Sequence, residues 1–150
     1  MPEWVWNGKR ERWILMCEQQ CRLARQKGRL KYYANKIEVL VVRSKYGQDA
    51  QLRAIASAYA ARLDFLQAAI STYLDGRPIK VYGGFKDPHQ YCEIVHPEKP
   101  GVDIRTIELL DAQYPKRVHI LVDTCYPDPY FDYEIIFEDM EIVDVSGRVS

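Results

Sequence analysis

Cysteine and histidine side chains lie at spacings that could bind zinc. Cys17 and Cys21 are four residues apart, and His89 and Cys92 follow later in the chain. Thiolate and imidazole are the ligands that tetrahedral zinc prefers. In the common zinc knuckle, however, two cysteines flank a tight turn, whereas we expect Cys17 and Cys21 within a helix, on its apolar stripe. Core packing is therefore the favoured interpretation. Zinc is kept only as a weak alternative, and no cofactor is predicted.

A second candidate for chemistry is the acidic segment "FDYEIIFEDMEIVDV", residues 131–145, in which six of fifteen residues are Asp or Glu. Phe131, Tyr133, Ile135 and Phe137 alternate with polar residues, which predicts a strand with one apolar and one acidic face. A hard cation needs several oxygens that converge on one point, usually from a loop. Because these carboxylates are spread along a strand, we expect them to meet positive charge from protein rather than a metal.

The alternation in this segment changes register at Glu138 and Asp139, because Met140 and Ile142 become the apolar alternates. A slip of one residue predicts a bulge or a tight turn at that point.

A nucleophile with a partner base is not supported by the sequence. His119, Asp123 and Cys125 alternate along one predicted strand. Residues four apart on a strand are separated by about 13 Å, too far for a direct hydrogen bond. No Walker, G-x-G-x-x-G, G-x-S-x-G or H-E-x-x-H pattern occurs. We therefore predict a protein that is not an enzyme and has no catalytic residues, with a small enzyme kept as an alternative.

Charge is distributed unevenly along a chain whose formal net charge is zero. Residues 1–62 contain thirteen Lys or Arg and five Asp or Glu, whereas residues 63–150 contain eight and sixteen. The two parts therefore carry +8 and −8. Such asymmetry says nothing about the fold, but it is a physical indication about partners.

The basic part has a possible role in binding nucleic acid. Its candidate phosphate contacts are Lys9, Arg10, Arg12, Lys27, Lys31 and Lys36, and two tyrosines are interleaved with them. The same residues could simply form the solvated face of a helix. The acidic part of the chain would also repel a phosphate backbone. Nucleic-acid binding is therefore an alternative and not the main prediction.

The main prediction is assembly between protein subunits through opposed charge and aromatic anchors. The expected interface residues are Trp4, Trp6, Arg22, Arg25 and Arg29 against Glu134, Glu138 and Glu141. The partner is the chain itself or other protein subunits, as in a virion or a ribonucleoprotein-like particle. Two alternatives stay open: the charges can meet within one chain, and the tryptophans can fold back onto their own core.

The elements that would position these residues are helices in the N-terminal part. Apolar spacings of three and four predict helices over residues 8–27, 30–47 and 49–74. Three such helices would form a long-helix hairpin or bundle. For the second of them, the β-branched run "IEVLVV" at residues 37–42 also fits a buried strand.

In the C-terminal part the apolar period changes towards two, which favours strands. Strands are expected at "IKVY" and "YCEIVH", then a short helix from residue 102 or 103 to about 114. "RVHILVDTCY" and the acidic segment follow as two more strands. The predicted fold class is α+β, with a helical region at 1–77 and a small ββαββ layer at 78–150 that form one compact unit.

Composition places the chain among ordinary soluble globular proteins of one domain. No run of eighteen apolar residues occurs, so we expect no membrane span. The start "MPEWVWNGKRERW" does not read as a signal peptide. Four cysteines are too few for a disulfide scaffold of this size, so reduced thiols and an intracellular location are expected.

Overall fold

The fold is described from a computed structural model. The structure describes residues 3–26, 29–83, 86–109, 116–126 and 131–149. Side chains are described for these residues except 19–35, 125, 126 and 149.

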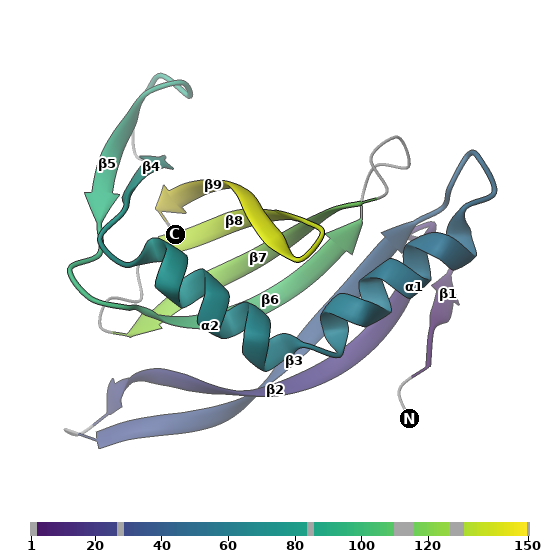
Figure 1. The fold of residues 1–150 in the computed structure, drawn as a ribbon, viewed down its shortest axis with the longest axis horizontal. Coiled ribbons are helices and arrows are strands. Elements are labelled where there is room, and N and C mark those ends of the chain that lie inside the picture. The colour runs from purple at the N-terminus through teal and green to yellow at the C-terminus, as the bar shows by residue number, and fades with distance from the viewer. Residues whose placement is uncertain (1–2, 27–28, 84–85, 110–115, 127–130, 150) are drawn as a thin grey trace.

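Among the described residues, nine strands form one mixed sheet, with the strand order β1-β2-β3-β6-β7-β8-β9-β4-β5 (Figure 1). The strands are β1 Val5–Asn7, β2 Arg12–Gln26, β3 Arg29–Val42, β4 Pro78–Tyr82, β5 Tyr91–Val95, β6 Gly101–Leu109, β7 Arg117–Tyr126, β8 Phe131–Glu138 and β9 Glu141–Val149. The pairs β3–β6 and β4–β9 are parallel, and all other neighbouring pairs are antiparallel.

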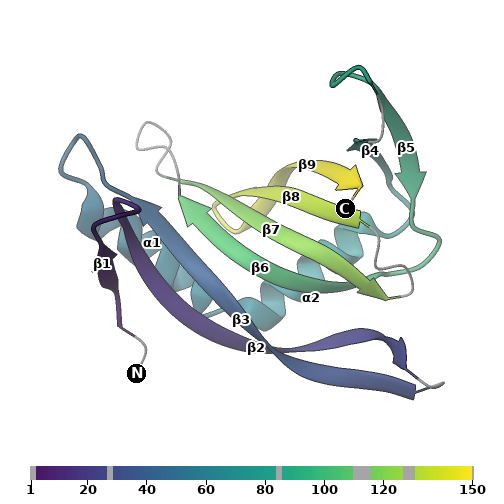
Figure 2. The same cartoon turned by 180° about the vertical axis from the view of Figure 1, so that it is seen from behind.

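Two helices, α1 Asp49–Ala60 and α2 Leu63–Leu74, lie on one face of the sheet (Figures 1 and 2). Their buried residues are Leu52, Ala56, Tyr59, Leu66, Ile70 and Leu74. They pack against alternate residues of the central strands, such as Val39, Ile120 and Ile135, which are fully buried. The core therefore lies between the helices and one sheet face, and the other face is left without a helix.

The prediction of an N-terminal bundle of about three helices is wrong, and so are the terms α+β and helical hairpin. Residues 8–27 and 30–47 mostly belong to β2 and β3, which form a long hairpin. The spacing misled because residues four apart share a face of a strand as well as a face of a helix. Trp13 and Cys17 contact the core in this way. The β-branched run at 37–42 forms a buried strand, as the alternative interpretation held.

The predicted helix over residues 49–74 is broken into two. The stripe of buried residues was predicted correctly, but the backbone leaves the helical region at Arg62, with φ −125° and ψ 39°. Neither glycine nor proline stands there to give a signal in the sequence. The break lets each short helix follow a part of the twisted sheet, which a straight rod of about 37 Å would not do.

In the C-terminal part the expected short helix is wrong, because residues 101–109 form strand β6. The pairing of β6 with β7 shifts between Ile104 and Thr106, which marks a bulge. This bulge places Ile104 and Ile107, three residues apart, both in the core. A single inserted residue thus produced a helix-like spacing within a strand. Residues 110–115, the rest of the predicted helix, lie outside the described residues.

Four other strands of the C-terminal part agree with the predictions: β4, β5, β7 and β8. The predicted change of register after β8 is also confirmed. Asp139 and Met140 form a turn with φ values of 51° and 65°, and the pairing of β8 with β9 shifts between Ile136 and Phe137. The alternation of β8 is as expected, with Tyr133, Ile135 and Phe137 buried.

The packing at Gly147 generates a test of this core. A Cβ atom added there would lie 2.9 Å from Cε1 of Tyr133 and 3.1 Å from a methyl group of Val81. Because Tyr133 and Val81 are buried, neither side chain can move aside freely. Gly147→Ala is expected to lower the free energy of unfolding by about 1–3 kcal/mol, measured by urea denaturation. Gly8→Ala, at a position with open space around it, is the control. Equal effects of the two substitutions would contradict the packing described here.

Candidate functional site

The hairpin of β2 and β3 extends beyond the rest of the sheet. β1 pairs with β2 only at Arg12–Ile14, and β6 pairs with β3 only at Glu38–Val41. Among the described residues, those from Glu18 to Lys36 pair only with each other. We call residues 18–36 the arm. It projects past the sheet (Figures 1 and 2), and its strands are about 30 Å long.

The arm concentrates the basic residues of the chain. Its sequence contains six Lys or Arg and one Glu, a net charge of +5, and the rest of the chain therefore carries −5. Three predicted interface residues, Arg22, Arg25 and Arg29, belong to this arm and not to helices. The basic part of the chain was thus identified correctly as a charged region, but the element that carries it was not.

The residues predicted to contact nucleic acid are divided between the two ends of the hairpin. Lys31 and Lys36 are in the arm, and Lys27 lies outside the described residues. Lys9, Arg10 and Arg12 are at the opposite end, around the β1–β2 turn. There the Arg10 guanidinium donates to the carboxylate of Glu38 at 2.9 Å. The five of these residues that the structure describes are therefore divided between two ends of the hairpin.

The acidic residues of β8 lie on the sheet face that no helix covers, and two of them meet basic groups of β7. The Glu134 carboxylate lies 3.1 Å from Nδ1 of His119, and Glu138 lies 3.6 Å from Nε of Arg117. Within the part of the chain that the structure describes, no group of His, Cys, Asp and Glu is arranged to hold a metal ion. Glu138 therefore has a cationic neighbour within its own chain, and Glu134 has an imidazole beside it.

A pair of carboxyl groups lies on the same uncovered face. Asp123 of β7 and Asp132 of β8 are opposite each other in the sheet, and Arg105 forms an ion pair with Asp123. The hydrogen bond to Asp123, partial burial and the Asp123 charge together raise the pKa of Asp132 to about 6, although Arg105 opposes this. Asp123 and Asp132 line a groove of about 450 Å³ together with Ser146 and Arg148. Asp132 therefore keeps the proton that it shares by hydrogen bond with Asp123 up to a higher pH than a free aspartic acid would.

The two tryptophans predicted as interface anchors, Trp4 and Trp6, differ from each other in their contacts and exposure. Nε1 of Trp4 donates to the Ser57 hydroxyl of α1 at 3.0 Å, so Trp4 folds back onto its own chain. Trp6 is 37% exposed and contacts Trp13 edge to face, with 5.3 Å between ring centroids. It remains available on the surface, near the exposed Val5 and Met16.

Trp13 links this cluster to α1. Its Nε1 donates to the Asp49 carboxylate at 3.1 Å, and that hydrogen bond is the main reason why the pKa of Asp49 is lowered.

The cysteine and histidine residues considered as zinc ligands do not come together. Cys17 on β2 packs against the core, and burial raises the pKa of its thiol. Cys92 lies on β5, at the other end of the strand order, and His89 lies just before that strand. Cys21 is in β2, but its side chain is outside the description. The interpretation of Cys17 as a core residue is confirmed.

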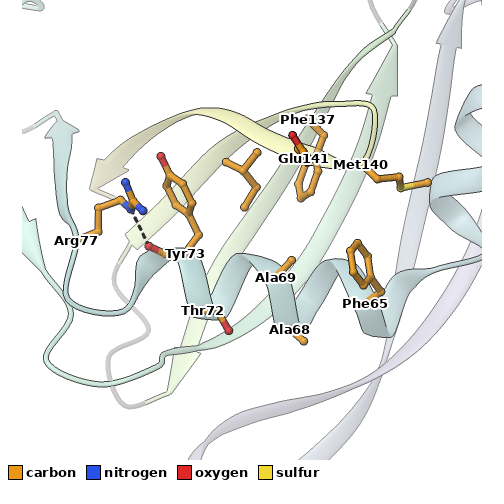
Figure 3. A pocket seen from close by; sticks show the side chains of 10 residues that line it. Phe65, Ala68, Ala69, Thr72, Tyr73, Arg77, Phe137, Met140 and Glu141 are labelled. Atoms are coloured by element: carbon orange, nitrogen blue, oxygen red, sulfur yellow. Dashed lines mark hydrogen bonds between the residues drawn. The ribbon is translucent and has the colours of Figure 1, made fainter.

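A surface that the sequence did not identify lies between α2 and the β8–β9 turn (Figure 3). We call residues 138–144 the acidic turn, because this segment contains four Asp or Glu and no Lys or Arg. We call the adjoining hollow, about 540 Å³, the α2 groove. Its apolar lining comes from Phe65, Ala68, Ala69 and Tyr73 of α2 and from Phe137, Met140 and Ile142.

The acidic turn is held in place by α1. The hydroxyl of Tyr59 accepts a hydrogen bond from the backbone N–H of Met140 at 2.9 Å, and its ring packs edge to face on Phe137. Glu141, the last predicted acidic interface residue, lines the α2 groove. The sequence did contain a signal for this groove. Apolar residues, Met140, Ile142 and Val143, alternate with the carboxylates of the turn, and a fully solvated turn would not need them.

Comparisons with protein-family models, with curated proteins and with solved structures found nothing that matches this chain. Neither of the described helices has the length and apolar content that crossing a membrane requires. The surfaces of this chain that are suited to binding a partner are the arm, the uncovered sheet face and the α2 groove.

The carboxyl pair makes stability depend on pH. The pKa of Asp132 is raised above the unfolded value of about 3.9, so the folded state binds the extra proton between about pH 4 and pH 6. Stability from this group is present below that window and is lost as the pH rises through it. Asp132→Asn cannot ionise, so its free energy of unfolding should rise relative to the parent chain between pH 4 and pH 7. Urea denaturation at each pH measures this difference; a difference independent of pH would refute the shared proton.

Proposed function

We propose that this protein is a non-enzymatic assembly subunit that associates with further copies of itself through the arm. The observation that carries the proposal is the two-stranded extension itself. Isolated two-stranded hairpins are marginal in water, and among the described residues the strands of the arm pair only with each other. A partner that pairs with the arm and neutralises its charge would supply the missing stabilisation.

The charge of the two surfaces favours a partner of the same kind. The arm carries a net charge of +5 and the remainder of the chain carries −5. The remainder of one copy therefore attracts the arm of another copy electrostatically. Complementary fields of this kind orient and accelerate association. Glu134 and Glu138 already have basic neighbours in their own chain. This makes the other carboxylates of the acidic turn, those of Asp139, Glu141 and Asp144, the better target.

Exposed apolar side chains also favour protein as the partner. Val5 is 62% exposed and Met16 46% exposed at the base of the hairpin, and Phe65 is 43% exposed beside the acidic turn. Apolar surface grouped beside charge is typical of protein interfaces, whereas nucleic-acid interfaces are polar and basic.

The arm can be removed without touching the core, and this gives the test. In an arm-less variant, Asn-Gly replaces residues 19–35 and joins the paired residues Glu18 and Lys36 in a tight turn. The parent chain is expected to form a discrete oligomer at 50 mM salt that dissociates at 500 mM. The arm-less variant is expected to be monomeric at both. Mass is measured by light scattering after size exclusion.

The thermal unfolding transition of each sample shows that the arm-less variant keeps its fold. A parent chain that is monomeric at both salt concentrations would overturn the proposal. An arm-less variant that associates as strongly as the parent would overturn it too.

A second function, nucleic-acid binding, is favoured by the shape of the arm. A two-stranded β-ribbon fits the major groove of B-DNA, and six basic residues could neutralise several phosphates. Fluorescence anisotropy with a labelled duplex and a labelled single strand distinguishes the two functions. Nucleic-acid binding predicts an affinity that falls steeply with salt, by about 0.9 in the logarithmic slope per phosphate contacted. Self-assembly predicts little binding to either strand form.

A further inference from the structure

Strand β9 has an open edge along most of its length. β8 pairs with it from Glu141 to Val149, but β4 pairs with it only at Gly147 and Arg148. Within the described part of the chain, residues 141–146 therefore have a strand neighbour on one side only. The backbone groups of such an edge are a template for a further strand.

The chain itself protects one point of this edge. The Val145 backbone N–H donates to the carboxylate of Asp144, its neighbour in sequence, at 2.9 Å. A side chain here supplies the acceptor that a neighbouring strand would otherwise supply. Acidic residues on an exposed edge also discourage pairing with uncharged strands. A basic strand would not be discouraged in this way.

The α2 groove lies beside the beginning of this edge and provides an apolar floor. Figure 3 shows Phe65, Ala68 and Tyr73 along α2, with Met140 and Glu141 on the strand segment above the helix. The length of α2 from Phe65 to Tyr73 is about 12 Å, which is about the length of four strand residues. Small side chains such as Ala68 and Ala69 keep the groove open between these ends.

Charge favours a basic occupant at the acidic-turn side of the groove, whereas Arg77 lines its other end beside Tyr73. Between residues 131 and 147 there are six Asp or Glu and no Lys or Arg, and four of the six belong to the acidic turn. The arm has the opposite charge, and two leucines and two tyrosines alternate with its basic residues. Among the described residues, the two strands of the arm pair only with each other, so their outer backbone edges are able to pair with another strand.

We propose that the arm of a second copy docks along the α2 groove and adds a strand to the open edge of β9. This inference rests on the proposed self-association and specifies its contact. The arm of the same chain is a less suitable occupant, because three strands, β6, β7 and β8, separate β3 from β9 in the strand order. Both views also show the arm projecting away from the β8–β9 turn (Figures 1 and 2).

The contact joins two different surfaces of the chain. A two-fold dimer would therefore bury it twice, by reciprocal exchange of arms, whereas a repeated head-to-tail contact would give a ring or a filament. In either case one copy contributes the arm to a given contact, and the other copy contributes the α2 groove and the edge of β9.

Matched substitutions in the full chain test the proposal. Ala68→Trp fills the α2 groove, and Ala58→Trp places the same bulk on the exposed surface of α1. Glu141→Lys reverses a charge beside the groove, and Glu98→Lys makes the same change in the β5–β6 connection. We expect Ala68→Trp and Glu141→Lys to raise the dissociation constant at 50 mM salt by about tenfold or more. The two controls should leave it unchanged, and Arg25→Glu should partly restore association of Glu141→Lys.

A photo-crosslinking residue, benzoylphenylalanine, at position 68 locates the contact directly. In a mixture of isotopically light and heavy chains, we expect crosslinks from position 68 of one copy to residues 18–36 of another. Absence of association in the parent chain would overturn both this inference and the proposed function. Association that requires the arm, but is unaffected by Ala68→Trp and Glu141→Lys or crosslinks elsewhere, would overturn this inference alone.

Discussion

The parallel pairing of β3 with β6 holds the two parts of this molecule together. It spans only Glu38–Val41 and Thr106–Leu109, yet it joins the N-terminal hairpin to the meander of β6, β7, β8 and β9. Its residues on the helix side, such as Val39 and Ile107, are fully buried beneath the helices. The arm can project from the sheet because this short pairing and the helix contacts anchor its base.

The sequence predicted the C-terminal strands better than the N-terminal ones, and the reason is physical. In β8, apart from Ile136, polar and apolar residues alternate because one face is buried and the other is uncovered. In β2, the polar residues of the arm interrupt the pattern, and the surviving apolar spacing of four fits a helix equally well. A bulge adds a residue to β6 at Arg105. The spacing of the buried residues there becomes three, which also resembles the period of a helix.

The candidate site was predicted in its chemistry but not in its geometry. The predicted pairing of Arg22, Arg25 and Arg29 with the acidic interface residues stays a prediction, and within the chain Glu134 and Glu138 lie beside His119 and Arg117 instead. No property of single residues could indicate that Arg22, Arg25 and Arg29 share one extended element. Nor could it indicate that Phe65 and Met140, more than seventy positions apart, line one groove. Which residues come together in this way depends on the order of the strands in the sheet, and the pattern of polar and apolar residues does not determine that order.

The second parallel pair has a consequence for how the chain reaches its fold. β4 joins the sheet only through β9, and the paired residues Val81 and Gly147 are separated by most of the C-terminal part. Until Gly147 has left the ribosome, the hairpin of β4 and β5 lacks the strand with which β4 pairs in the described structure. Contacts so distant in sequence form slowly. We therefore expect the β4–β5 hairpin to be added last, onto a meander that has already formed, with its apolar side chains exposed until then.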